Sequence, residues 1–216
     1  MKNRYYSLKL ALICIIVFIL QAMIKGFTEL FVLNENSFFQ PWRFVSAIFL
    51  HGSLLHLLYN MFALALFGLF LEGLIGSKRF VLIFLVSGIL ANLVSILFYP
   101  SSLGASGAIF GVIGALIVIR PLLIVWAFGL PMPIFVAGIL WAAGDLMGAI
   151  GFLAGNPIDN TGNIAHLSGM FFGLLFGSLY RDWAKRREKR GKIRINERYM
   201  RGWEDNYLNR RFVTTL

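Results

Sequence analysis

Long apolar segments alternate with short polar or basic segments along most of the chain. An apolar helix of about 20 residues crosses a hydrocarbon core of about 30 Å, and most of these segments approach that length. The pattern therefore predicts an all-α polytopic membrane protein, a bundle of six transmembrane helices. The six segments cover residues 8–24, 54–72, 80–98, 106–119, 131–152 and 163–180.

Composition agrees with this fold class. Hydrophobic residues make up 58% of the chain and charged residues 14%, and the mean hydropathy is +0.76. The first segment begins among basic residues like a secretory signal, but no small-x-small cleavage site follows before Lys25, so we expect a retained span. The single cysteine, Cys14, lies in this segment as a small core residue and excludes an intrachain disulfide.

The placement of Lys and Arg predicts the orientation. These residues collect in cytoplasmic loops, and here they cluster at the N-terminus, at Lys78 and Arg79, at Arg120 and after residue 180. An even number of spans with both termini in the cytoplasm places every cluster on that side. We therefore expect a multi-pass protein of the cell membrane whose outer loops are 25–53, 99–105 and 153–162.

The C-terminal segment is basic, with twelve Lys or Arg residues against five Asp or Glu and a net charge of +7. We divide the chain into a six-span membrane domain, residues 1–180, and a basic cytoplasmic tail, residues 181–216. No aromatic interleaving or folded module accompanies the basic residues, which disfavours nucleic acid as a partner. The tail is expected to contact anionic membrane lipid, and the pattern predicts no particular oligomeric state.

The fourth apolar segment is too short to cross the bilayer. From Ser106 to Ile119 it has 14 residues, about 21 Å of helix against a core of about 30 Å. If Arg120 lies at the inner interface, Ser106 lies roughly 10 Å below the outer one, and residues 99–105 must descend to it as irregular chain. Such backbone is tolerated at that depth only inside protein or beside a water-filled cavity. Hydrolysis needs that water.

Small residues recur at every fourth position on two segments and would let their helices pack closely. Both segments run from outside to inside, so the helices are parallel. Ser106 and His166 lie near the start of the two stripes. Packing the stripes together would bring hydroxyl and imidazole to similar depth, near hydrogen-bonding reach, although such stripes are common in any helical bundle. They consist of Gly107, Gly111 and Ala115 in the fourth segment and Ala165, Gly169, Gly173 and Gly177 in the sixth.

A further polar group lies at the start of the second segment. His56 and Asn60 are spaced i, i+4 and share a helix face, at the outer end where Ser106 and His166 also lie. An Asn amide, a His N–H and the unpaired N–H groups at a helix start are donors suited to a developing oxyanion. Alternatively, both residues join helices as polar contacts. His51 is expected to point elsewhere, as a structural hydrogen-bonding residue.

In this order, the motifs resemble the rhomboid family of intramembrane serine proteases. The resemblance covers about residues 40–180 and includes Pro41-Trp42-Arg43 in the first outer loop. Three motifs in the right order on a six-span chain make it specific. They are His51-x4-His56-x3-Asn60, the sequence GASGAIFG over residues 104–111, and AHLSGMFFG over residues 165–173.

The resemblance implies a serine endopeptidase that hydrolyses peptide bonds in or near the transmembrane helices of single-span membrane proteins, below the extracytoplasmic surface. It implies that Ser106 is the nucleophile and His166 the general base of a two-residue site. His56, Asn60 and the Ser106 backbone N–H would stabilise the oxyanion. Substrates would have small residues at the cut and would enter past a mobile fifth span.

Residues flanking the nucleophile are expected to support it. By the resemblance, Gly104 and Ala105 shape the loop that carries Ser106, and Gly107 supports the same turn. Phe110 departs from the family pattern, since many members have a tyrosine there against the catalytic imidazole. We expect ring stacking to persist without the phenolic hydroxyl. The linker 121–130 and the last outer loop also vary within the family.

Other classes of protein require residues or sequence features that this chain lacks. A zinc protease needs H-E-x-x-H, which is absent, so no metal or cofactor is expected. A two-aspartate intramembrane protease is excluded, because Asp145 alone among carboxylates lies well inside a predicted span. The soluble G-x-S-x-G elbow needs glycine where Ala108 stands. Two non-enzymatic alternatives are a rhomboid-like protein that binds or escorts helices, expected to lack Ser or His, and a transporter, expected to show an internal repeat.

Narrower predictions concern four polar or aromatic residues. Asp145 lies roughly 10 Å deep, near the level of Ser106, but the stripes join the fourth and sixth spans and leave its helix peripheral. We therefore expect Asp145→Asn to change activity only modestly. Trp42 and Arg43 are expected to seat the first outer loop among lipid headgroups. Glu72 is expected to snorkel to the interface or to pin a loop.

Overall fold

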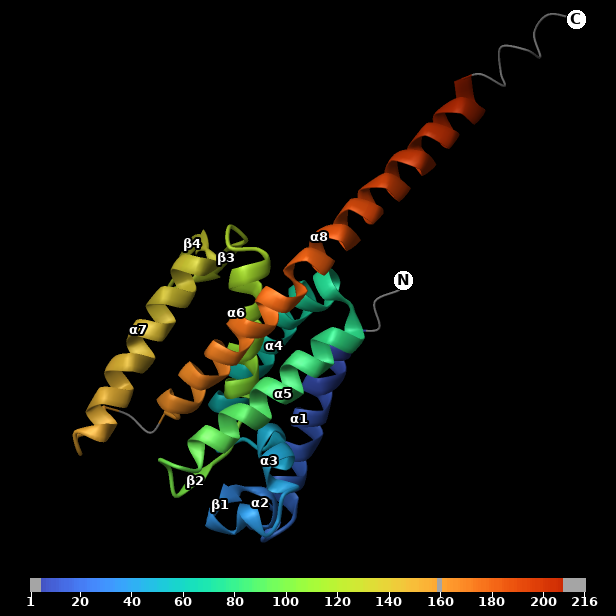
Figure 1. The fold of residues 1–216 in the computed structure, drawn as a ribbon. Helices are drawn as coiled ribbons and strands as arrows, with labels where there is room; N and C mark the ends of the chain where they lie inside the picture. Colours follow the sequence, from blue (N-terminus) through green and yellow to red (C-terminus); the bar gives the residue numbers. More distant parts are fainter. Residues whose placement is uncertain (1–4, 159–160, 208–216) are drawn as a thin grey trace, which may run out of the picture.

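The computed structural model describes residues 5–158 and 161–207, and it places side chains up to residue 187. Six main helices form a bundle (Figure 1), which confirms the predicted polytopic helical architecture. Each lies on one of the predicted apolar segments. They are α1 (Tyr6–Met23), α4 (Leu54–Ile75), α5 (Ser77–Ser95), α6 (Ser106–Ile119), α7 (Ile134–Leu153) and α8 (Asn163–Tyr207).

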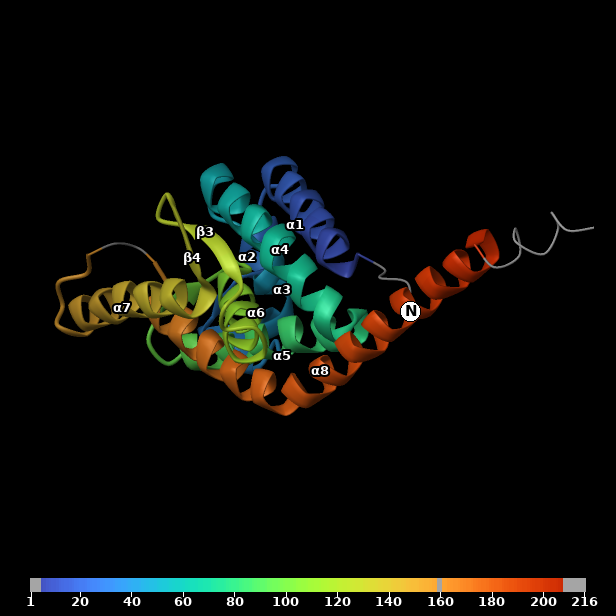
Figure 2. The ribbon, with the colours of Figure 1, turned by 90° about the horizontal axis from the view of Figure 1, so that it is seen from above.

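Length distinguishes the helices. Within the described residues, α1, α4, α5 and α7 are long and apolar enough to cross a membrane, whereas α6 is a shorter apolar helix. The apolar segment 163–180 forms the first part of α8. As predicted, α6 begins at Ser106 and ends at Ile119. It contacts α4, α5, α7 and α8, and Figure 2 shows it inside the bundle with α1 and α7 on different flanks.

The small-residue stripes of α6 and α8 pack against each other, as the sequence predicts. A side chain added at Gly169 would meet the backbone of Gly107, and one at Gly173 would meet the backbone of Gly111. Added at Gly177, it would lie 2.8 Å from the Ala115 carbonyl oxygen. Only glycine permits this approach, so the stripes fix the separation and register of the two helices.

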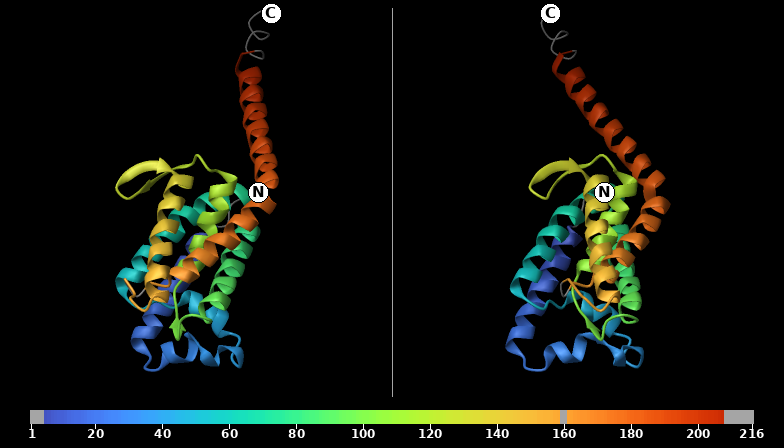
Figure 3. Two further views of the ribbon diagram at one scale, coloured as in Figure 1. Left: turned by 60° about the vertical axis from the view of Figure 1, so that its left-hand side comes forward. Right: turned by 90° about the vertical axis from the view of Figure 1, so that its left-hand side faces the viewer.

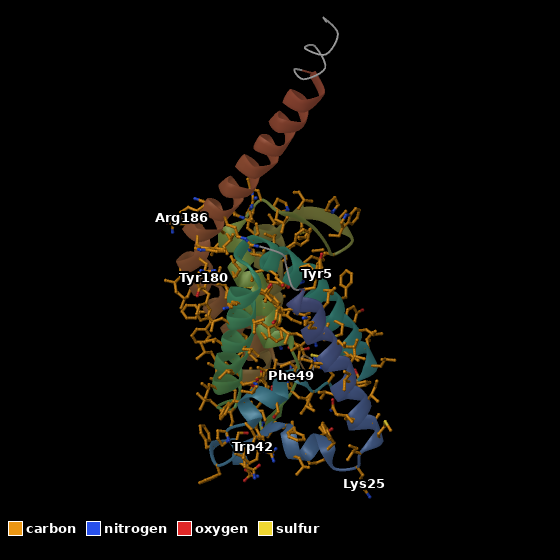
Figure 4. All side chains as sticks on the ribbon, turned by 90° about the vertical axis from the view of Figure 1, so that its right-hand side faces the viewer. Tyr5, Lys25, Trp42, Phe49, Tyr180 and Arg186 are labelled. Carbon is orange, nitrogen blue, oxygen red and sulfur yellow. The ribbon has the colours of Figure 1, made fainter. Side chains whose placement is uncertain are left out.

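Basic clusters gather at one end of the bundle. Arg79 and Arg187 both lie over the Trp183 ring, at 3.8 and 5.6 Å from its centroid. Figure 4 shows Tyr5, Tyr180 and Arg186 at this end, opposite Lys25 and Trp42. Tyr5, at the start of the described chain, therefore lies on the same side as Arg79, Arg187 and the neighbouring part of α8. Which compartment that side faces remains a prediction.

Glu72 holds the start of α1 at this end. Its carboxylate accepts hydrogen bonds from the backbone N–H groups of Tyr6 and Ser7, both at 3.1 Å, and from the Ser77 hydroxyl at 2.6 Å. It is 1% exposed. The expectation that Glu72 pins a chain segment is confirmed, and the snorkelling alternative is wrong because the carboxylate points into the bundle.

The chain does not leave helical structure at residue 180. Helix α8 continues to Tyr207 (Figure 3), so the boundary placed between residues 180 and 181 marks a change of composition inside one helix. The linker 121–130 also has regular structure, since β3 (Ile124–Ala127) pairs antiparallel with β4 (Leu130–Pro133). Exposed aromatic side chains on this hairpin, Trp126 and Phe128, suit a membrane interface.

The loop between α1 and α4, which the sequence predicts to lie outside, is folded around a buried arginine. It contains α2 (Phe27–Phe31), β1 (Leu33–Asn34), η1 (Glu35–Phe38), α3 (Arg43–Ser46) and η2 (Ala47–Phe49), and β1 pairs with β2 (Ser101–Ser102). Arg43 donates to the carbonyl oxygens of Glu29 and Val32 at 2.8 and 2.7 Å and is 5% exposed. The prediction that Arg43 contacts headgroups is wrong, because loop carbonyls without helical partners need its donors. Trp42 is 50% exposed.

Candidate active site

Ser106 is the first residue of α6, at the point where an irregular segment enters the bundle. The segment is anchored by a 2.9 Å hydrogen bond from the Gly104 N–H to the Ala47 carbonyl oxygen. Gly104 has φ +127°, and a side chain there would lie 2.8 Å from Cε1 of His56. Glycine is therefore required both by the backbone conformation and by the close approach of the imidazole. That Gly104 shapes the loop for catalysis stays a prediction.

The start of α6 has free donors. Its N-cap residue, Ala105, is fully buried and makes no side-chain cap hydrogen bond. The first N–H groups of an α-helix lack intrahelical partners and carry the positive end of the helix dipole. The backbone N–H groups of Ser106 and Gly107 thus present donors and partial positive charge beside the Ser106 hydroxyl.

His166 lies in the first turn of α8, where its N–H donates to the Gly162 carbonyl oxygen at 3.0 Å. Its ring stacks on Phe110, with centroids 4.4 Å apart and planes inclined by 9°. The predicted stacking without a phenolic hydroxyl is therefore confirmed. Because Gly107 and Gly169 bring α6 and α8 into backbone contact here, the imidazole and the Ser106 hydroxyl face the same space.

That space is a cavity of about 1200 Å³. It brings together the four predicted polar residues, which come from three helices. Gly104, Gly107 and Phe110 also line it, and the buried Ala105 lies behind its wall. The lining includes Ser106 from α6, His166 from α8, and His56 and Asn60 from α4.

Asn60 offers an unused donor. It is 6% exposed, and its Nδ2 atom is buried with no hydrogen-bond partner among the described residues. This Nδ2 group therefore makes no polar contact between helices within the described chain. An unpaired buried N–H group is costly and fits a site where a ligand oxygen is bound.

His51 packs against His56 instead of pointing elsewhere. Their ring centroids are 5.1 Å apart at an interplanar angle of 64°, so the expectation drawn from their five-residue spacing is wrong. The chain before Leu54 is not yet helical, and helical spacing does not apply to it. The His51 backbone N–H donates to Gln21 Oε1 at 2.9 Å. Burial, with a smaller effect from His56, lowers the pKa of His51 from 6.5 to about 4.

Asp145 is the site residue that sequence reasoning set aside. Its Oδ1 atom lies 3.0 Å from Nδ1 of His166, and its side chain is 9% exposed. The expectation that its helix keeps it apart from the site is wrong, because the C-terminal part of α7 packs against the start of α8. Side-chain atoms of Asn163 fill the space beside Gly148. The sequence did hold one signal for Asp145, since it predicts that Asp145 and Ser106 lie at similar depth in the membrane.

Metal chemistry has no evident ligand set in the described chain, where no three His, Cys, Asp or Glu side chains converge as a metal site. The polar groups that do line the cavity include the Ser106 hydroxyl, the His56 and His166 imidazoles and the Asn60 amide. This set suits nucleophilic acyl transfer, which needs a nucleophile, a base and oxyanion donors.

Comparison with known proteins gives a consistent result. Residues 39–183 match the family model described as the Rhomboid domain. The chain is 37% identical to RHOMBOID-like protein 7 of Arabidopsis thaliana over 142 residues, 65% of this chain and 43% of that protein. It is 37% identical to the rhomboid protease GluP of Bacillus subtilis over 147 residues, 64% of this chain and 27% of that protein. With the rhomboid protease GlpG of Haemophilus influenzae the identity is 29% over 181 residues, 79% of this chain and 88% of that protein.

Proposed function

Since the chain belongs to the rhomboid family, we propose that it is an intramembrane serine endopeptidase in which Ser106 is the nucleophile and His166 the general base. The chain spans less than half the length of the first two relatives compared above, so its own activity and substrates are part of the proposal. Its substrates would be the transmembrane helices of single-span membrane proteins.

The observation that carries this proposal is the convergence of Ser106, His166, His56 and Asn60 on one cavity inside an apolar bundle. Polar side chains are costly within a membrane and are functional candidates by default. A packing role does not account for an unpaired Asn60 amide beside a helix start without a cap. An acyl-transfer site accounts for both.

The first half-reaction forms an acyl-enzyme. The Ser106 Oγ attacks the scissile carbonyl carbon while its proton passes to Nε2 of His166. The tetrahedral intermediate carries negative charge on the former carbonyl oxygen. Asn60 Nδ2, the His56 ring N–H and the Ser106 backbone N–H would donate to that oxygen. The imidazolium then returns its proton to the leaving amine as the C–N bond breaks.

The second half-reaction releases the enzyme. A water molecule in the cavity gives a proton to His166 and attacks the acyl carbon, and the same donors stabilise the second oxyanion. As this intermediate collapses, the bond between the acyl carbon and Ser106 Oγ breaks, the His166 imidazolium returns its proton to Oγ, and the new carboxyl end is freed. The cavity lies at the end of the bundle opposite the basic clusters, where water enters from the outer face in the predicted orientation.

Access for a substrate helix is proposed between α4 and α7. The cavity is lined on one side by residues of α4, including Tyr59 and Phe62, and on the other by Trp141 and Phe152 of α7. Tyr59 and Phe62 are 69% and 67% exposed, so they would contact lipid or an incoming apolar helix. An apolar entrance leading to a polar cavity suits a membrane-embedded substrate.

The test is cleavage of a generic single-span substrate by the purified protein in lipid vesicles. Wild type should cut the substrate near its outer end, whereas Ser106→Ala and His166→Ala should each abolish the cut while folding normally. The double variant should be no worse than either single variant, since the two residues act as one unit. Binding of the helix without any cleavage by wild type would support the alternative, a non-catalytic rhomboid-like protein that escorts helices.

A further inference from the structure

We propose that Asp145 is a positioning residue that holds His166 in one tautomer and one orientation for proton transfer. This inference rests on the proposed function, because it assigns a third residue to the same site. Its starting point is the 3.0 Å contact between Asp145 Oδ1 on α7 and His166 Nδ1 on α8.

The contact fixes where the imidazole carries its proton. An ionised carboxylate can only accept a hydrogen bond, so Nδ1 of His166 must be the donor. The other ring nitrogen, Nε2, is then left with a lone pair. That tautomer is the one a general base needs toward the Ser106 hydroxyl, and the carboxylate also stabilises the imidazolium that forms when the proton arrives.

The rest of the ring is fixed independently. Phe110 stacks in parallel on one face, which fixes the plane of the imidazole but leaves rotation within that plane open. The hydrogen bond from Nδ1 to Asp145 removes this freedom. Phe110 from α6 thus fixes the plane of the His166 ring, and Asp145 from α7 fixes its rotation within that plane.

Asp145 has no evident structural task. It is 8% exposed, and its Oδ2 atom is buried without a partner among the described residues. Burial of a carboxylate is costly unless it is paired. Glu72, the comparable buried carboxylate at the other end of the bundle, accepts hydrogen bonds from three donors that anchor α1 and the start of α5. Among the described residues, the hydrogen-bond partner of Asp145 is the imidazole of His166.

Packing holds the carboxylate in register with the ring. Gly148 lies one turn after Asp145, and a side chain added there would collide with Asn163 at the start of α8. The close approach of α7 to α8 at this point therefore sets the distance between Asp145 and His166. A shift of α7 relative to α8 would therefore change the orientation of the His166 imidazole.

The first test measures cleavage kinetics, pH dependence and melting temperature for Asp145→Asn. The amide can donate to Nδ1 and favour the wrong tautomer, so kcat should fall by about 10²–10⁴, up to the value for the equivalent change in a soluble triad. KM should change little. The shape of the pH–rate profile should change as well, because the base that transfers the proton no longer has its carboxylate partner. Other titratable groups near His166 are His56 from α4 and Tyr99, whose hydroxyl accepts from the Ile164 N–H, and both are unchanged.

Glu72→Gln is the matched control, since it also neutralises a buried carboxylate. It should lower the melting temperature and leave kcat and the pH profile unchanged. An Asp145→Asn variant that behaves in the same way would overturn the proposal and make Asp145 a structural contact. Retention of wild-type kcat with an unshifted profile would also overturn it, and loss of cleavage in Ser106→Ala would still support the proposed function.

A second readout does not depend on activity. In protein labelled with ¹⁵N-histidine, the NMR signals of His166 should report the Nδ1–H tautomer in wild type and in Ser106→Ala, and a mixture or the Nε2–H form in Asp145→Asn. An Nε2–H tautomer in wild type would overturn the proposal even if the protein cleaves. If wild type cleaves nothing, the proposed function fails and the tautomer measurement still decides the role of Asp145.

Discussion

The contact between the small-residue stripes should control catalysis through the spacing of α6 and α8. Gly169 lies one turn after His166, and Gly107 directly follows Ser106. A side chain at Gly169 would place its carbon 2.9 Å from the Gly107 carbonyl carbon and 3.2 Å from its Cα. The Gly107 carbonyl oxygen lies closer still to the added carbon. Carbon atoms pack at about 3.5–4.0 Å, so Gly169→Ala requires the helices to separate by roughly 1 Å, beside both Ser106 and His166.

The expected cost has two parts. Overpacking of this kind destabilises by about 1–3 kcal/mol, partly offset by about 1 kcal/mol of better helix propensity for alanine. A misplacement of about 1 Å between reacting groups can lower the rate about 10²-fold. Gly169→Ala should therefore lower the melting temperature moderately and kcat by roughly 10–10², measured in vesicles with a single-span substrate.

Gly144→Ala is the matched control for this prediction. It makes the same change on α7, where nothing lies within 4 Å of the added carbon, so melting temperature and kcat should stay at or above wild-type values. If Gly169→Ala matched Gly144→Ala in both measurements, the helix spacing would not set the geometry of the site.

Three further predictions concern the rest of the site and the topology. His56→Ala and Asn60→Ala should each lower kcat by about 10²–10³ at most, as for one lost oxyanion donor. A lower melting temperature with unchanged turnover would instead favour polar contacts between helices. Burial and the nearby His56 lower the pKa of His51 from 6.5 to about 4. The folded protein therefore favours the neutral ring, and the stability that this contributes is complete above pH 6.5 and is lost as pH falls from 6.5 towards 4. Melting temperatures should fall over this window in wild type and less in His51→Gln. Cysteines placed at Ile158 and Arg181 should be labelled from opposite sides of the membrane, outer and cytoplasmic respectively, and labelling of both from one side would refute the six-span topology.

The sequence predicts the parts of this protein that depend on periodicity and length. Spans follow from apolar runs, and the pairing of α6 with α8 follows from glycines at every fourth position, since little else permits backbone contact between helices. The short α6 follows from the distance between Ser106 and Arg120. Each of these features follows from a repeat or a length that is visible in the sequence, and the structure confirms them.

Features that depend on irregular chain or on helix tilt could not be derived in this way. His51 meets His56 because the residues before Leu54 are not helical. Arg43 is buried because a loop with unpaired carbonyls folds around it. Asp145 reaches His166 because α7 packs against the start of α8 near Gly148. Depth in the membrane was predictable for Asp145, but its lateral position was not.

The most direct test of the central claim is covalent capture of the nucleophile. Wild-type protein in vesicles is treated with a fluorophosphonate probe, and the modified residue is located by mass spectrometry. The account predicts a single adduct on Ser106, formed much more slowly in His166→Ala and absent in Ser106→Ala. Labelling of Ser106 at the wild-type rate in His166→Ala, or an adduct on another residue with Ser106 unmodified, would contradict it.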